Sequence, residues 1–172
     1  MRRLPYVLMT IAAAWFCSLN PTHASAAREV SYSAELTGHE EVPLRESNAT
    51  GHATFQLSKD GLSMTFKVVV ADIENVTAAH IHLGARGMSG PAIAVLYGPV
   101  RAAGGKKAGV LAEGTITSAT LTGDLAGHPL ADLVMAMDAG NTYVDIHTDD
   151  GAGAPGTRSG DYPDGEIRGQ IH

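Results

Sequence analysis

The sequence predicts an all-β fold, an antiparallel β-sandwich of Greek-key type with one short helix. Three observations lead to this prediction. Apolar residues alternate with other residues in short runs, turn residues separate these runs, and glycine makes up 20 of the 172 residues. Many short alternating strands separated by turns are typical of antiparallel sheets that close on each other.

The alternation predicts about nine strands and identifies the faces that form the core. Asp60-Gly61 separates two of these strands and indicates a tight hairpin. The expected strands are residues 30–36, 53–57, 62–70, 77–83, 92–97, 111–117, 119–125, 143–148 and 166–171. The residues expected to be buried are Phe55, Leu57, Met64, Phe66, Val68, Ile81, Val144, Ile146, Ile167 and Ile171.

One segment departs from the alternation. Residues 128–140 combine helix-forming residues with an early Pro129 and a terminal Gly140, which predicts a short helix. Residues 102–109 and 149–164 are rich in glycine and are expected to be loops. The acidic residues of the second loop do not have the spacing of a calcium loop, so we interpret it as a solvated loop.

The first 26 residues have the pattern of a cleavable export signal. Arg2 and Arg3 precede a mostly apolar stretch, and Ala24-Ser25-Ala26 supplies a small-x-small cleavage pattern. The apolar stretch is shorter than the roughly 20 residues that a spanning helix needs. We therefore expect a periplasmic or secreted protein with no membrane anchor after cleavage, in which residues 27–172 form one domain.

Composition excludes several classes of function. The net charge of the chain is −6, which does not suit a nucleic-acid-binding protein. The single cysteine, Cys17, lies in the expected leader. The exported chain then has no thiol, which excludes disulfides, thiolate metal sites and cysteine nucleophiles.

Three histidines in two strand-like segments give the clearest indication of function. Side chains two residues apart on a strand share a face, so His80 and His82 point the same way. The same rule places His147 beside Asp145 and Tyr143 on another strand. If the two strands are neighbours, the three imidazoles can surround an ion at about 2 Å. The alternative is that His80 and His82 form hydrogen bonds within a half-exposed sheet face.

Other polar residues are weaker candidates for the same site. Asp145 or Glu166 would orient a ligand imidazole or help to neutralise the ion. Glu166 shares a strand face with Arg168, and we expect the two to form a structural ion pair or to orient neighbouring groups, in preference to acid-base work. His39 and Glu41 would join the site if the end of the first strand folded over it, whereas a surface position is the simpler expectation for His39.

Four segments, in this order along the chain, carry a resemblance to a known family. They are residues 36–43 (LTGHEEVP), 79–84 (AHIHLG, followed by Gly87, Gly90 and Pro91), 143–148 (YVDIHT) and 165–171 (GEIRGQI). Together they resemble the CHRD domain, which is named for its occurrence in chordin and is also found in exported bacterial proteins. Asp145 stands where the family often has asparagine. Because chordin is an extracellular binding protein, the resemblance implies no catalytic residue.

Three classes of function remain. The first is binding of a transition metal through His80, His82 and His147, with copper favoured and zinc next, because thiol-free imidazole sites suit both ions. The second is a protein-binding or structural module without metal, with a protein partner or a second copy of the chain. The third is a redox enzyme, because the His-x-His strand is similar to the copper-binding strand of copper-zinc superoxide dismutase. No nucleophile and base are combined in the sequence, so we do not expect an enzyme.

Overall fold

The computed structural model describes residues 29–172 except 155 and 157, and these residues form an antiparallel sheet of eight strands. The order across the sheet is β5-β4-β7-β8-β1-β2-β3-β6. The strands are β1 (Ser31–Thr37), β2 (Thr50–Leu57), β3 (Ser63–Glu74), β4 (Val76–Leu83), β5 (Ala92–Tyr97), β6 (Lys106–Thr117), β7 (Thr142–Thr148) and β8 (Ile167–Gln170).

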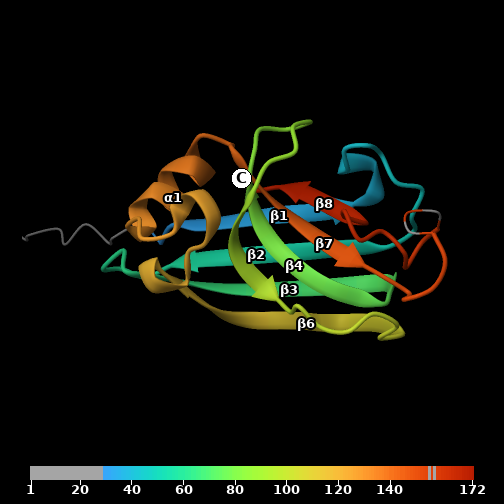
Figure 1. Cartoon of the computed structure of the whole chain (residues 1–172). Coiled ribbons are helices and arrows are strands. Elements are labelled where there is room, and N and C mark those ends of the chain that lie inside the picture. The colour runs from blue at the N-terminus through green and yellow to red at the C-terminus, as the bar shows by residue number, and fades with distance from the viewer. Residues whose placement is uncertain (1–28, 155, 157) are drawn as a thin grey trace, which may run out of the picture.

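The sheet curls until its two end strands approach each other. In Figure 1, β4 runs obliquely in front of β2 and β3, and β7 passes in front of β2, so that one sheet supplies both layers around the core. A single bridge between Ala94 and Leu121 connects β5 to the segment after β6. The predicted all-β antiparallel fold with one short helix is confirmed, and its two layers belong to one continuous, nearly closed sheet.

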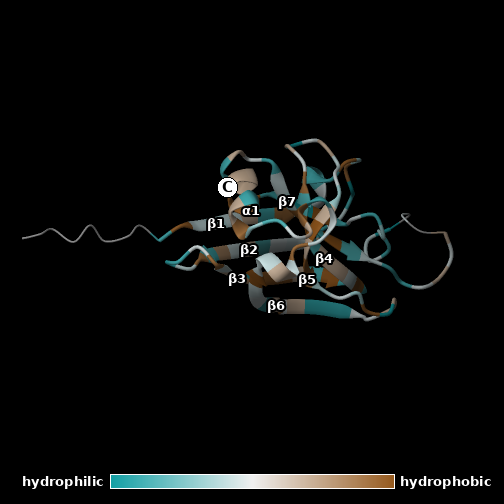
Figure 2. Ribbon diagram, turned by 60° about the vertical axis from the view of Figure 1, so that its left-hand side comes forward, coloured by the Kyte–Doolittle hydropathy of each residue, from teal (hydrophilic) through white to brown (hydrophobic). Residues whose placement is uncertain are grey.

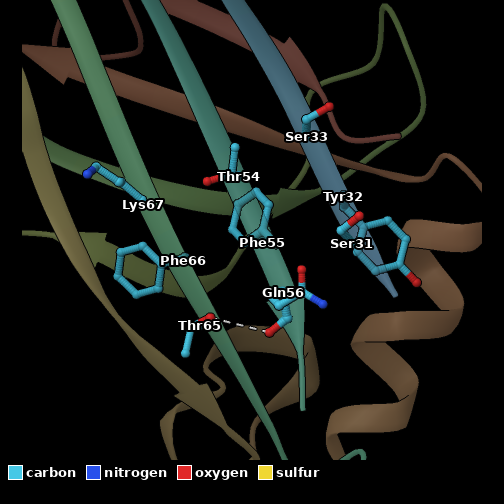
Figure 3. Close-up of a pocket in the computed structure, with 9 residues that line it drawn as sticks. All are labelled: Ser31, Tyr32, Ser33, Thr54, Phe55, Gln56, Thr65, Phe66 and Lys67. Atoms are coloured by element: carbon cyan, nitrogen blue, oxygen red, sulfur yellow. Dashed lines mark hydrogen bonds between the residues drawn. The ribbon is translucent and has the colours of Figure 1, made fainter. Parts of the chain in front are cut away.

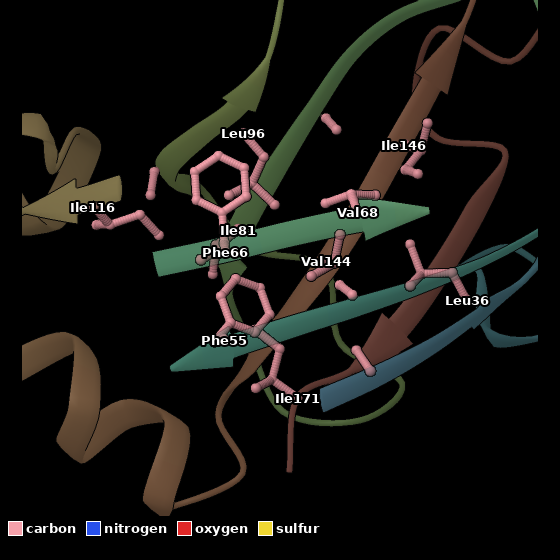
Figure 4. Packing of buried hydrophobic residues seen from close by; sticks show 14 of the residues in the cluster. Leu36, Phe55, Phe66, Val68, Ile81, Leu96, Ile116, Val144, Ile146 and Ile171 are labelled. Atoms are coloured by element: carbon pink, nitrogen blue, oxygen red, sulfur yellow. The ribbon is translucent and has the colours of Figure 1, made fainter. Parts of the chain in front are cut away.

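The core occupies the space between these layers. Figure 4 shows Phe55, Phe66 and Val68 on one side and Ile81, Val144 and Ile146 on the other, and all six are buried. Figure 2 shows the matching hydropathy, with apolar ribbon segments on the crossing strands. Of the residues expected in the core, Leu57 is only half-buried, because it lies at the end of β2 next to the hairpin.

Most elements match the prediction, and the hairpin at Asp60-Gly61 forms as expected. Leu57 pairs with Met64 across it, and Gly61 has φ +71°, a conformation that favours glycine. The expected helix is α1 (Leu130–Asp138), preceded by Pro129. No helix among residues 29–154, 156 and 158–172 has the length and apolar character that crossing a membrane requires.

The prediction of a strand at residues 119–125 is wrong. The segment forms two 3-10 turns instead, η2 (Ser118–Thr120) and η3 (Gly123–Leu125). The side chain of Thr120 bonds to the backbone of Thr117, and Gly123 has φ +53°, so the chain cannot continue as an extended strand. Part of the loop expected at residues 102–109 is also extended, because β6 begins at Lys106 and pairs there with Glu74.

The expected leader, residues 1–26, lies outside the described residues. Its cleavage and the export that follows from it stay predictions.

Phe66 provides a test of the core. Its ring is buried and lies against Gly114 of β6, where an added Cβ would be 3.0 Å from the ring. We expect Phe66→Ala to lower the free energy of unfolding by about 3–5 kcal/mol, because a buried ring is lost and a cavity is left. Chemical denaturation measures this change. The control is Leu62→Ala at a side chain that is 71% exposed, for which we expect a change within about 0.5 kcal/mol. Equal stability of the two variants would contradict the assigned core face.

Candidate metal centre

A hollow on the outer face of β1, β2 and β3 does not have the chemistry of a metal site. It has a volume of about 410 Å³ (Figure 3). Its lining contains neither histidine nor carboxylate and consists of Ser31, Tyr32, Ser33, Thr54, Phe55, Gln56, Thr65, Phe66 and Lys67. The three histidines and Asp145 lie elsewhere, on the outer face of β4 and β7.

The three histidines come together because β4 pairs with β7. His80 lies opposite Asp145, and Ala78 lies opposite His147, so His147 is diagonal to His80 on the same face. The ring centroids are 5.6 Å apart for His80 and His82, 5.1 Å for His80 and His147, and 5.8 Å for His82 and His147. Each imidazole has a nitrogen within 4.8 Å of a nitrogen of the other two. The assumption that the two strands are neighbours is confirmed.

Backbone carbonyls select the tautomer of two of these imidazoles. His82 Nδ1 is 2.9 Å from the carbonyl oxygen of Gly90, and His147 Nδ1 is 2.9 Å from that of Pro163. A carbonyl oxygen only accepts, so both Nδ1 atoms carry the proton and both Nε2 atoms keep a free lone pair. His82 Nε2 is buried and has no hydrogen-bond partner in the described chain. Such carbonyl contacts are how proteins orient metal-binding histidines.

The spacing of His80 and His147 also suits a common ion. His80 Nδ1 lies 3.2 Å from His147 Nε2. Two nitrogens at this separation, each about 2.0 Å from one ion, subtend an angle of about 105° at it, close to the tetrahedral value. Because His147 Nε2 carries no proton, the His80 Nδ1–H donates this hydrogen bond. Binding of an ion between the rings would place the His80 proton on Nε2 instead.

Burial keeps the three imidazoles in the neutral form that metals bind. Desolvation is the main cause, and it lowers the pKa of His80, His82 and His147. The pKa of His147 falls to about 4, with the neighbouring His80 adding to the effect. Charge on His82 similarly lowers the pKa of His80, and Arg168 lowers that of His82. All three side chains are nevertheless half-buried, so solvent reaches the centre.

Glu41 and Asp145 form a buried acidic pair beside the histidines. Their exposed fractions are 7% and 4%, and a Cβ on Gly165 would lie 2.8 Å from Glu41 Oε1 and 2.6 Å from Asp145 Oδ1. Burial raises the pKa of both carboxyl groups, and the charge of Glu41 raises that of Asp145 further. The guanidinium groups of Arg168 and Arg45 oppose these shifts. One buried oxygen of each carboxyl group, Glu41 Oε1 and Asp145 Oδ1, has no hydrogen-bond partner in the described chain.

Glu166 supports loops and does not contact a histidine in the described chain. Its buried carboxylate accepts hydrogen bonds from Ser47 (2.5 Å), Ser159 (2.6 Å), Thr148 (2.6 Å) and the backbone N–H of Gly160 (2.8 Å). The expected ion pair with Arg168 is also not formed among the described contacts. A carboxylate with four donors has no need of a cation, which explains both differences.

His39 lies on the surface, in η1 (Gly38–Glu40), and is not part of the three-histidine group. A separate group of carboxylates lies in the loop after β7, formed by Asp149, Asp150 and Asp161. Asp149 accepts from the N–H of Gly151, and Asp150 accepts from that of Ala152 and pairs with Arg158. These hydrogen bonds and this ion pair connect residues within the loop, which agrees with the loop expected at residues 149–164.

Several contributors to the site were missed by the sequence analysis. The carbonyls of Gly90 and Pro163 carry no signal in residue type, because any residue offers a carbonyl. Tyr143 was placed on the correct face, but its ring contact with His82 was not expected: the centroids are 5.0 Å apart and the planes differ by 17°. Arg168 covers the other side of that ring, 3.4 Å from its centroid.

The fold and the site define an all-β protein with a thiol-free three-histidine group on the outer face of a curved antiparallel sheet. Comparison with known families places it more closely. Residues 32–154, well over half of the chain, match the CHRD domain, and the chain belongs to the CHRD domain family. Neither the curated proteins nor the solved structures contain a match to it.

Protonation of His147 links the site to stability. Its pKa is about 4 in the folded protein, against about 6.5 in an unfolded chain. As the pH falls from about 6.5 to about 4, the unfolded state binds this proton before the folded state, so the free energy of unfolding decreases. The contribution is fully present above pH 6.5, and its loss amounts to up to about 3 kcal/mol.

The variant His147→Gln isolates this effect. It lacks the titrating group, so the difference in unfolding free energy between wild type and variant should shrink as the pH falls through this window. Urea denaturation at several pH values measures the difference, in which the other titrating groups cancel. Parallel pH profiles of the two proteins would contradict the lowered pKa.

Proposed function

We propose that this protein binds a transition metal ion through His80, His82 and His147, with copper favoured and zinc as the alternative. The observation that carries the proposal is the convergence of three imidazoles, each with a nitrogen within 4.8 Å of the others. Shifts of about an ångström in side-chain position bring such nitrogens to a common distance of about 2 Å from an ion. The two carbonyl contacts at Nδ1 and the buried, unpartnered Nε2 of His82 support this role.

The donor set favours copper. All three donors are neutral imidazoles, and the neighbouring carboxylate of Glu166 accepts four hydrogen bonds of its own. Imidazole donors suit Cu(II) and Zn(II), and among divalent ions of the first row affinity is highest for Cu(II).

The role that we propose is binding in the periplasm or outside the cell, not catalysis. The leader pattern of residues 1–26 supports export. Two of the titratable groups near the centre are held in buried contacts: Glu166 accepts from four donors, and Arg168 donates to two backbone carbonyls. Neither is free to act as an acid or a base.

Isothermal titration with Cu(II) and with Zn(II) tests the proposal. We expect the wild type to bind one ion, and His80→Ala and His147→Ala to bind at least about 100-fold more weakly, because each variant removes one of three ligands. His52→Ala is the matched control, since His52 is a surface histidine paired with Glu35 at 2.7 Å and lies on β2. Wild-type binding no tighter than that of the His80 and His147 variants would overturn the metal proposal in favour of a metal-free binding module.

The lowered histidine pKa values predict an unusual pH dependence of metal binding. Protons compete with a metal only near and below the pKa of the ligand. We therefore expect the dissociation constant to begin to rise only below the ordinary histidine pKa of about 6.5 and to keep rising toward pH 4, near the pKa of His147, with little proton release at pH 7. Competition with a chromophoric chelator measures the first effect, and titration in buffers of different ionisation enthalpy measures the second. A steep loss of affinity that begins at pH 7 would contradict the prediction.

A further inference from the structure

Tyr143 and Arg168 form a stack beneath one of the three histidines. The Tyr143 ring lies almost parallel to that of His82, with centroids 5.0 Å apart. The Arg168 guanidinium lies over Tyr143, 3.4 Å from the ring centroid. Both residues are buried, with 2% of each exposed. The order of the stack follows from the register. Tyr143 is opposite His82 on β4 and opposite Gln170 on β8, and Gln170 shares its strand face with Arg168.

The same two residues hold the segment that connects β4 to β5, residues 84–91. Arg168 Nη2 donates to the carbonyl oxygens of Ala85 (3.2 Å) and Met88 (2.9 Å). The Tyr143 hydroxyl accepts a hydrogen bond from the N–H of Gly90 at 3.0 Å. The carbonyl of Gly90 in turn accepts from His82 Nδ1. A closed path of contacts therefore runs from Arg168 through this segment to the imidazole of His82.

Glycine is needed for the segment to pack so closely. A Cβ on Gly90 would lie 1.7 Å from the carbonyl oxygen of Leu83. A Cβ on Gly84 would lie 2.8 Å from the Met88 carbonyl oxygen and 3.0 Å from the Tyr143 ring. Real Cβ atoms do not approach backbone so closely, so a side chain at either position would displace the segment from the stack.

We propose that Arg168 and Tyr143 are positioning residues for the metal centre: they hold residues 84–91 so that the Gly90 carbonyl keeps His82 in the Nδ1–H tautomer, with its Nε2 lone pair available beside His80 and His147. This inference rests on the proposed function for its consequence in metal affinity. The tautomer of His82 is a property of the protein without metal, so it can be tested separately.

Lysine cannot replace arginine in this role. The planar guanidinium lies flat on the ring and at the same time directs an N–H toward two carbonyl oxygens, whereas an ammonium group is a point charge on a flexible stem. Arg168→Lys therefore keeps the positive charge but removes the planar group that contacts both the ring and the two carbonyl oxygens. Tyr143→Phe keeps the ring stack and removes the hydroxyl that holds the Gly90 amide.

Arg45 provides a matched control. Its guanidinium also lies over a tyrosine ring, that of Tyr162 at 4.8 Å, and it also donates to a backbone carbonyl, that of Gly165 at 3.2 Å. It makes no contact with residues 84–91 among the described hydrogen bonds. Arg45→Lys thus removes a similar arrangement at a different loop.

The first experiment records long-range ¹H–¹⁵N spectra of the histidine side chains in the metal-free proteins at pH 7. We expect wild type and Arg45→Lys to show His82 as the Nδ1–H tautomer. We expect Arg168→Lys and Tyr143→Phe to show a mixture with the Nε2–H form. Thermal unfolding followed by circular dichroism confirms that each variant is folded, and Tyr143→Phe retains the buried ring if Arg168→Lys is too unstable. His82 held as Nδ1–H in both Arg168→Lys and Tyr143→Phe would overturn the proposal.

The second experiment measures the dissociation constant for Cu(II). We expect an increase of at least about tenfold in Arg168→Lys and Tyr143→Phe, the usual effect of losing a group that orients a ligand, and less than about threefold in Arg45→Lys. An equal effect of all three variants would show a general loss of stability and would overturn the positioning role. If the wild type itself binds no metal, the proposed function fails, while the tautomer measurement still decides whether Arg168 and Tyr143 position His82.

Discussion

The register between β4 and β7 is the constraint on which the rest of the structure depends. It places His80 and His82 beside His147 on the outer face and, at the alternate positions, Ile81, Val144 and Ile146 in the core. A slip by one residue would turn the histidines inward and the isoleucines toward water. Burial of the apolar face therefore determines the position of the imidazoles, and the energy that holds the centre together comes largely from the opposite side of the sheet.

The outer face of β7 and β8 is polar and buried, and burial of a polar group is costly when the group lacks a hydrogen bond. Loops supply bonds to several of these groups, whereas Asp145 Oδ1 and Gln170 Oε1 have no partner in the described chain. Gln170 Nε2 donates to the carbonyl oxygens of Gly84 (3.0 Å) and Gly140 (2.7 Å). Glu166 accepts hydrogen bonds from two further segments. The loops thus form a second layer over this face, and the same layer provides the carbonyls that orient His82 and His147. Stability of the loops and geometry of the histidines are two results of one set of hydrogen bonds.

The sequence was sufficient for the parts of the fold that depend on local periodicity. Alternation identified the faces of β4 and β7, and the helix formers between Pro129 and Gly140 identified α1. It could not show which strands are neighbours, because a strand's pattern does not specify its partner. Residues 119–125 alternate like a strand, yet the contacts of Thr120 and the positive φ of Gly123 turn the chain there. The role of Glu166 was missed for a similar reason, since its four donors come from segments distant in sequence or in a loop.

The two connections that contact the histidines differ in how much change of length they can accept. Four residues of the eight-residue connection between β4 and β5 bond to Arg168, Tyr143, Gln170 and His82, and two of its glycines lie against backbone. An inserted residue would displace the Gly90 carbonyl from His82. Between β7 and β8, the contact with His147 is made by Pro163, near the end of the connection, whereas Gly151, Ala152 and Gly153 are exposed. A peptide tag or a fluorescent reporter inserted between Ala152 and Gly153, after the two N–H groups that Asp149 and Asp150 accept from, would therefore leave the three imidazoles in place.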